Sequence, residues 1–207
     1  RNLDLHDLLK RVKHYDSTRR KDALWGLREL FAAHGATSKL LQRSLSVVFR
    51  TIANTMVDTD KGVRDALYTL LEVVLPCIDV VSVATPFLQR LVAYAGSAMT
   101  SMEREIRMDA VRFVNLLLDW NADGIRTEQN RLSLLPSLVS VLSSISLVNA
   151  TSGIQHQSHA FSVGGTAMTR DGIRSDSKKN RLGAQYAADR HIQKVLMTIE
   201  KLIGGGD

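Results

Sequence analysis

The sequence predicts an all-α protein built from stacked helical hairpins, and three observations lead to this prediction. A short motif recurs along the chain at a nearly constant interval. Apolar residues repeat with helical spacing between the copies of that motif. Aromatic residues make up only 5% of the chain and there are three prolines, against 44% hydrophobic residues, a profile that favours helices over sandwiches or barrels.

The recurring motif has an arginine, an aspartate and two apolar residues in fixed order. Its copies are Arg20-Lys21-Asp22-Ala23-Leu24, Arg64-Asp65-Ala66-Leu67 and Arg107-Met108-Asp109-Ala110-Val111. The arginines are 44 and 43 residues apart. A period near 43 with two helical patterns per period is typical of HEAT and armadillo arrays, in which neighbouring hairpins close one another's core. We therefore predict a HEAT/armadillo-like α-solenoid of about four helical hairpins, the last interrupted by a long loop.

The first two hairpins follow from their apolar stripes. Leu5, Leu8, Leu9 and Val12 have the i, i+3, i+4, i+7 spacing of a first helix. Its partner is expected over about residues 18–33, before Gly35. The second hairpin is expected to comprise helices at residues 39–57 and 61–75, because apolar residues recur through both segments and Pro76 ends the second.

The third hairpin is expected at residues 82–98 and 102–120, followed by a turn at 121–124. A helix at 127–147 begins the fourth hairpin, and Pro136 within it is expected either to kink the helix or to shift its start. Residues 149–180 are rich in Ser, Gly, His and Gln without periodicity, which predicts a largely disordered or extended insertion. A helix at 182–203 completes the pair. The chain thus divides into repeats (1–148), a flexible polar and basic insertion (149–180) and a final helix (181–207).

An acid stands four residues before each motif arginine. At the start of a helix such an acid is favourable, and the arginine can pair either with it or with an acid of the next repeat. Periodic recurrence argues for a structural role rather than an enzymatic one. We predict a ladder that fixes how the repeats stack, made of Asp16, Arg20, Asp60, Arg64, Glu103 and Arg107.

The net charge of +6 is concentrated at the two ends of the chain. Residues 1–30 carry a charge of +3 and residues 170–201 a charge of +4. These ends would attract RNA phosphates or an acidic partner, although ordinary solubilising charge explains them equally well. The candidate contact residues are Lys10, Arg11, Lys13, Arg170, Arg174, Lys178, Lys179 and Arg181.

The sequence contains none of the catalytic, phosphate-binding or dinucleotide-binding motifs that would indicate an enzyme. A single cysteine excludes an internal disulfide and a cysteine-based zinc cage. His156 and His159 form the closest histidine pair, and a solvated loop explains them better than a metal site. No apolar run approaches the length of a membrane span. We expect no catalytic residue, cofactor, metal or membrane contact.

The opening segments resemble a known family. Leu9-Lys10-Arg11-Val12-Lys13-His14-Tyr15 and the segment from Arg20 to Leu30 resemble the pre-rRNA-processing family known as Ipi-one, or testis-expressed-ten. Asp58-Thr59-Asp60-Lys61-Gly62-Val63-Arg64 is similar to a second pattern of that family, which is common to many HEAT proteins. The resemblance covers roughly residues 3–75, and beyond them it is expected to be only architectural.

This resemblance implies a nuclear scaffold subunit of the Rix complex. Its implied partners are a central helical-repeat scaffold, a WD40 propeller subunit, the AAA ATPase midasin and the maturing large ribosomal subunit near the second internal transcribed spacer. It implies localisation to the nucleolus and nucleoplasm. Other hypotheses remain open at this point: a HEAT adaptor of another nuclear or transport complex, direct RNA binding by the domain and, last, an enzyme.

Overall fold

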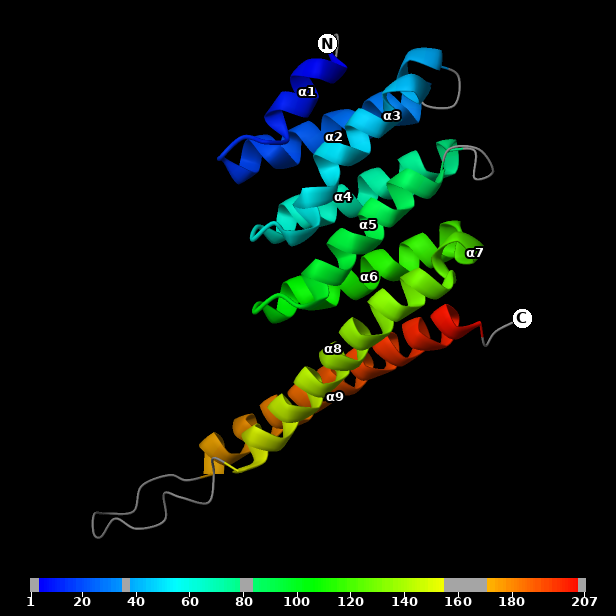
Figure 1. Ribbon diagram of the computed structural model, residues 1–207. Helices are drawn as coiled ribbons and strands as arrows, with labels where there is room; N and C mark the ends of the chain where they lie inside the picture. Colours follow the sequence, from blue (N-terminus) through cyan, green and yellow to red (C-terminus); the bar gives the residue numbers. More distant parts are fainter. Residues whose placement is uncertain (1–3, 35–37, 79–83, 155–170, 205–207) are drawn as a thin grey trace.

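The computed structural model describes residues 4–34, 38–78, 84–154 and 171–204, and this part of the chain is all-α (Figure 1). Its helices follow one another along the chain. They are α1 (Leu5–Arg11), α2 (Ser17–His34), α3 (Lys39–Ile52), the 3₁₀ helix η1 (Ala53–Val57), α4 (Lys61–Val74), the 3₁₀ helix η2 (Leu75–Cys77), α5 (Ala84–Met99), α6 (Arg104–Trp120), α7 (Ala122–Ile125), α8 (Glu128–Ile154) and α9 (Asp171–Ile203).

The helices pack as antiparallel pairs that stack on one another in two layers (Figure 1). One layer consists of α1, α3, α5 and α8, each in contact with the next. The other consists of α2, α4, α6 and α9, again in contact in that order. The helices of each layer therefore contact the hairpin before or after them, which is how a hairpin with one apolar face buries it.

The core is continuous between the two layers. Leu24, Leu27 and Phe31 of α2 are fully buried, as the i, i+3, i+7 spacing requires. This packing gives the reason for the recurring motif: the alanine and the apolar residue that end each copy are buried in all three copies. These residues are Ala23, Leu24, Ala66, Leu67, Ala110 and Val111.

The predicted helices are present, with differences at their ends. The segment expected as one helix at 39–57 is α3 followed by η1, and Pro76 lies inside η2 rather than simply ending a helix. The prediction of a plain turn at 121–124 is wrong. Asn121 accepts a hydrogen bond from the Gly124 amide at 2.9 Å and caps the single-turn helix α7.

The expected insertion at 149–180 is too long at both ends. The helix α8 continues through Pro136 as far as Ile154, and α9 already begins at Asp171. The two helices run side by side and project beyond the other pairs (Figure 1). Contact with an antiparallel neighbour stabilises helix where the local sequence shows no periodicity. Residues 155–170, including His156, His159 and Arg170, lie outside the described residues.

Candidate interaction surface

Arg20 joins the first hairpin to the second. Its Nε and Nη2 donate to the two carboxylate oxygens of Asp58 at 2.7 and 2.8 Å, a bidentate ion pair. Its Nη1 donates to the main-chain carbonyls of His14 and Tyr15 at 3.0 and 2.7 Å. One guanidinium therefore holds the turn before α2 and links it to the turn before α4.

Arg64 makes the corresponding connection from the second hairpin to the third. Its Nε donates to Asp109 on α6 at 2.8 Å, and its Nη1 donates to the carbonyls of Asp58 and Thr59 at 2.7 and 3.1 Å. Its Nη2 lies 3.7 Å from Glu105. The Arg64 side chain is only 1% exposed and that of Asp109 is 17% exposed, so the Arg64–Asp109 pair is largely buried, whereas Glu105 is 74% exposed.

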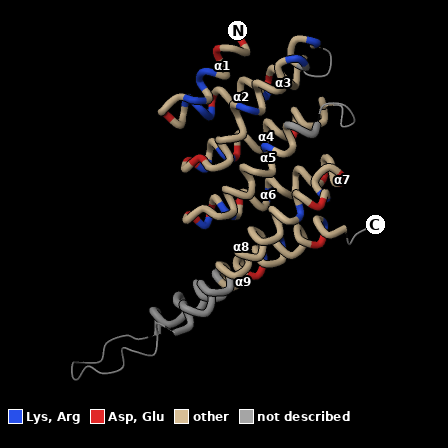
Figure 2. The backbone as a smooth tube through the Cα atoms, in the orientation of Figure 1, with Lys and Arg blue, Asp and Glu red and all other residues tan. Residues whose placement is uncertain are grey.

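Arg107 makes the main-chain hydrogen bonds of this arrangement but no described ion pair. Its Nη1 donates to the carbonyls of Ser101 and Met102, both at 2.8 Å. Its Nε is buried and has no hydrogen-bond partner within the described part of the chain. Each of the three arginines thus binds the carbonyls six and five residues before it. Among the side chains that the structure describes, an acid of the next hairpin is bound by Arg20 and Arg64 but not by Arg107. The three turns lie in line along one edge of the molecule, where charged residues gather (Figure 2).

Two of the acids four residues before the arginines accept hydrogen bonds from main-chain amides at the start of a helix. Asp16 accepts a hydrogen bond from the Thr18 amide at 2.9 Å, and Asp60 accepts one from the Val63 amide at 3.1 Å. Glu103 occupies the N-cap position of α6 without a side-chain capping bond. Of the two pairings that the sequence left open, Arg20 and Arg64 make the one that reaches the next hairpin.

Electrostatic effects at this edge favour the charged forms. The hydrogen bonds with Asp58 raise the pKa of Arg20 above its ordinary value, although partial burial acts against them. The amide of Val63, with further help from Ser17 and Lys21, lowers the pKa of Asp60. Both groups therefore stay ionised at neutral pH.

A second connection between α4 and α6 lies on the surface. Asp65 accepts hydrogen bonds from Lys61 at 2.6 Å and from Arg112 at 2.9 Å. Burial acts to raise the pKa of Asp65, but the hydrogen bonds and charges of Lys61 and Arg112 lower it. The Arg112 guanidinium also lies 3.5 Å from the ring centroid of Tyr68, a cation–π contact.

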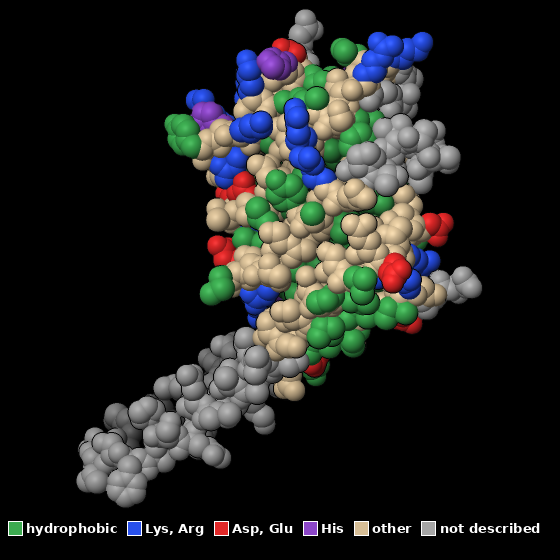
Figure 3. Space-filling model, viewed as in Figure 1, with side chains coloured by type: hydrophobic (Ala, Val, Ile, Leu, Met, Phe, Trp, Pro, Cys, Tyr) green, Lys and Arg blue, Asp and Glu red, His purple; other side chains and the backbone are tan. Residues whose placement is uncertain are grey.

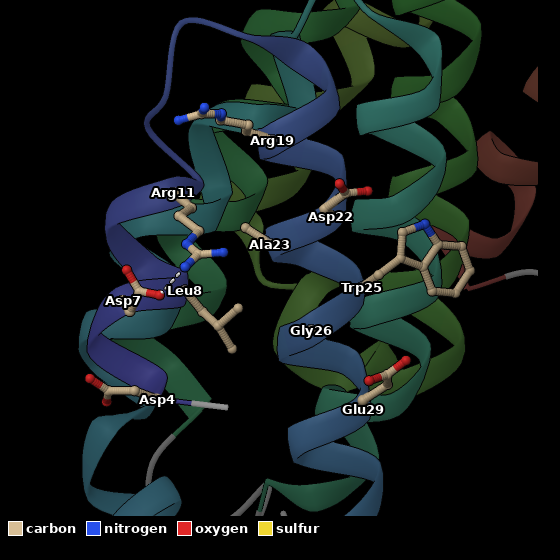
Figure 4. Close-up of a pocket in the computed structure, with 10 residues that line it drawn as sticks. All are labelled: Asp4, Asp7, Leu8, Arg11, Arg19, Asp22, Ala23, Trp25, Gly26 and Glu29. Carbon is tan, nitrogen blue, oxygen red and sulfur yellow. Dashed lines mark ion pairs between the residues drawn. The ribbon is translucent and has the colours of Figure 1, made fainter. Parts of the chain in front are cut away.

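A groove of about 1090 Å³ lies between α1 and α2 (Figure 4). Its charged lining residues are Asp4, Asp7, Arg11, Arg19, Asp22 and Glu29. Arg11 and Asp7 form an exposed ion pair at 2.5 Å within it. Trp25 is 40% exposed beside the charged residues. The lining also includes the apolar residues Leu8 and Ala23.

The candidate phosphate-binding residues do not meet at one place in the described structure. Lys10, Arg11 and Lys13 are exposed on and just after α1, with Arg11 engaged by Asp7. Arg174, Lys178, Lys179 and Arg181 lie on α9, where the side chains are outside the described residues.

Sequence reasoning missed three parts of this surface. It assigned no contact to Asp58, although this residue begins the segment that is similar to the second family pattern. It assigned no partner to Asp109, although this residue belongs to the recurring motif. It also overlooked Arg50 on α3 and Arg90 on α5, which line a common hollow of about 210 Å³.

Among the described residues, no three histidine, cysteine or acidic side chains are grouped to hold a metal ion. None of the described helices has the length and hydropathy needed to cross a membrane.

Comparison with known families decides the relationship. Residues 82–188 match the Ipi1_N family model, described as a Rix1 complex component involved in 60S ribosome maturation. The chain belongs to this family. The match lies beyond the segment that carried the sequence resemblance, so the expectation that residues after 75 share only architecture is wrong.

Two curated relatives agree with this assignment. The chain is 37% identical over 119 residues to "Testis-expressed protein 10 homolog" of Danio rerio, covering 58% of this chain and 12% of the relative. It is 27% identical over 127 residues to "Pre-rRNA-processing protein ipi1" of Schizosaccharomyces pombe, covering 61% of this chain and 29% of the relative. The chain therefore spans only a minor part of either relative's length.

A solved structure shares the fold. A chain of the "Rix1-Rea1 pre-60S particle - 60S core, body 1" matches with a TM-score of 0.56 and 18% identity. The match covers 97% of this chain and 71% of that one. Similarity at this identity indicates that the packing of this Ipi1_N chain is shared over nearly its whole length.

Proposed function

We propose that this chain is a non-catalytic scaffold domain of a Rix-complex subunit that acts in maturation of the large ribosomal subunit. The family match over residues 82–188 carries the proposal. The described residues support a binding role, because they present grooves and charged edges. A fold of this kind hosts many functions, so the pathway comes from the family and not from the helices.

The stacked pairs are best understood as a HEAT/armadillo-like α-solenoid. The pairing of each layer in chain order and the 43–44-residue interval of Arg20, Arg64 and Arg107 support this. In such an array Arg20 and Arg64 would set the stacking of one hairpin on the next through Asp58 and Asp109. Asp16, Asp60 and Glu103 would begin the helices that carry them.

The proposed partners are those implied by the family: the central helical-repeat scaffold and WD40 propeller of the complex, midasin and the pre-60S particle. The corresponding location is the nucleus, in nucleolus and nucleoplasm. Contact of the basic residues at the two ends with rRNA is a further part of the proposal, because the charge excess lies there.

The test is depletion of the full-length protein followed by rescue. Depletion should cause precursors that contain the second internal transcribed spacer to accumulate, and the tagged wild-type protein should cosediment with pre-60S particles and restore processing. Normal precursor levels after depletion, together with cosedimentation in an unrelated nuclear or transport complex, would instead support a HEAT adaptor of another class.

A further inference from the structure

The α3 and α5 segments carry positive charge with no acid of their own. Residues 39–57 and 84–99 include Lys39, Arg43, Arg50 and Arg90 and not one aspartate or glutamate. The neighbouring helices differ, because α2, α4 and α6 of the other layer, and also α1 and α8, all carry acids as well as bases. Figure 3 faces the layer of α3, α5 and α8, where blue side chains lie over α3 and α5 with no red side chain among them.

Two of these arginines converge on one hollow. Arg50 comes from α3 and Arg90 from α5, and both line the hollow of about 210 Å³ together with Ser46, Val47 and Phe87. Beneath it Phe87 stacks on the buried Phe49, with ring centroids 5.4 Å apart. The hollow therefore has an apolar, well-packed floor and a cationic rim.

The outer face of α3 also exposes apolar side chains. Leu40 is 70% exposed and Val47 is 42% exposed. They are seven residues apart and so lie on one face of the helix, with Arg43 and Arg50 each three residues after one of them. An amphipathic helix docks through its apolar face, and cations beside the apolar contacts favour a partner that carries acids there.

We propose that the surface formed by Leu40, Arg43, Val47, Arg50, Phe87 and Arg90 is a docking site for an acidic amphipathic helix of another protein. Apolar side chains of that helix would contact Val47 and enter the hollow above Phe87. Its carboxylates would pair with Arg50 and Arg90, whose planar guanidinium groups suit bidentate contacts. Phosphate binding alone would not use the exposed Leu40 and Val47, which is why a protein segment fits this surface better than RNA.

The proposal rests on the proposed function only for the complex in which the partner protein is expected. The experiment is site-specific photo-cross-linking in cells, with p-benzoylphenylalanine in place of Ser46 in the full-length protein. The control carries the same group in place of Glu72, an exposed residue of α4 in the opposite layer. Cross-linked products are isolated and identified by mass spectrometry, and cosedimentation with pre-60S particles is measured separately.

We expect a cross-link from position 46, absent from position 72, to a peptide whose carboxylates and apolar residues alternate at helical spacing. The double variant Arg50→Glu/Arg90→Glu should reduce this product at least tenfold, and Arg50→Lys/Arg90→Lys should retain most of it. Both variants change exposed residues, so circular dichroism should show unchanged helix content. A cross-link to RNA, to a peptide without acids, or to nothing would overturn the inference, as would a product insensitive to charge reversal. Continued cosedimentation in any of these cases would leave the proposed function intact.

Discussion

Arg64 on α4 donates a 2.8 Å hydrogen bond from its Nε to Asp109 on α6, across 45 residues of sequence. The Arg64 side chain is 1% exposed and that of Asp109 is 17% exposed. A largely buried ion pair adds little net stability compared with apolar packing. Removing only one of its two partners is nevertheless strongly destabilising, because the other charge is then left buried. The pair therefore specifies how the second hairpin meets the third.

Replacing Asp109 by alanine should destabilise the chain by about 3–5 kcal/mol, because the buried Arg64 would lose its hydrogen-bonded carboxylate and keep only the exposed Glu105, 3.7 Å from its Nη2. Urea unfolding followed by circular dichroism measures this. The double variant Arg64→Met/Asp109→Leu should recover most of the loss, since both charges are then gone. Asp7→Asn serves as the control, because its ion pair with Arg11 is half-exposed and should matter by no more than about 1 kcal/mol. A change at Asp109 as small as that at Asp7 would contradict the buried-pair interpretation.

Arg20→Lys should cost about 1–3 kcal/mol although it keeps the charge. Arg20 makes four hydrogen bonds in a fixed fork, two to Asp58 and two to main-chain carbonyls, and an ammonium group cannot reproduce this geometry. The measurement is again the free energy of unfolding. The neighbouring exposed Arg19 provides the matched substitution, and Arg19→Lys should change stability by less than about 0.5 kcal/mol. Equal changes in unfolding free energy for Arg20→Lys and Arg19→Lys would show that the four hydrogen bonds of the Arg20 guanidinium do not contribute to stability.

Acid should weaken the fold partly through Asp60. Its pKa is lowered from 3.8 in the folded chain, so the ionised carboxylate stabilises the fold above that value, and this stability is lost as the pH falls through the lowered pKa. Asp60→Asn keeps a good helix-capping side chain but cannot titrate. Unfolding free energies measured from pH 7 down to pH 2 should therefore fall less steeply for the variant. Identical slopes would exclude Asp60 as a contributor.

If the basic residues of α9 contact RNA, neutralising them should lower RNA affinity. Glutamine at Arg174, Lys178, Lys179 and Arg181 should weaken binding of a single-stranded pre-rRNA fragment and reduce the slope of log K against log salt by about 0.7 for each lost contact. Filter binding at several salt concentrations measures both quantities. The same substitution at Lys10, Arg11 and Lys13 tests the other end separately. If the salt dependence of RNA binding were unchanged in both variants, these residues would not contact RNA, and their charge would serve only solubility.

The sequence indicated the hairpins well because helix formation leaves a local trace. Apolar residues at i, i+3, i+4 and i+7 must face a core, and the motif that ends in Ala23-Leu24, Ala66-Leu67 and Ala110-Val111 recurs because the same contact recurs. The ends of α8 and α9 left no such trace. Residues 149–154 and 171–180 are helical in the structure, as continuations of two helices that contact each other.

The tertiary structure alone decided the partners of the motif arginines. Arg20 was equally compatible with Asp16, four residues away, and with an acid in the next hairpin. It pairs with Asp58, 38 residues away, because the capping bond to Thr18 engages Asp16 and stacking brings the turn before α4 to the guanidinium. The meeting of Arg50 with Arg90 above Phe87 likewise depends on how α3 packs beside α5. By itself, the sequence determined that this chain forms repeating helical hairpins, because periodicity is a property of neighbouring residues. Which charges meet was decided only by stacking, because those residues lie tens of positions apart.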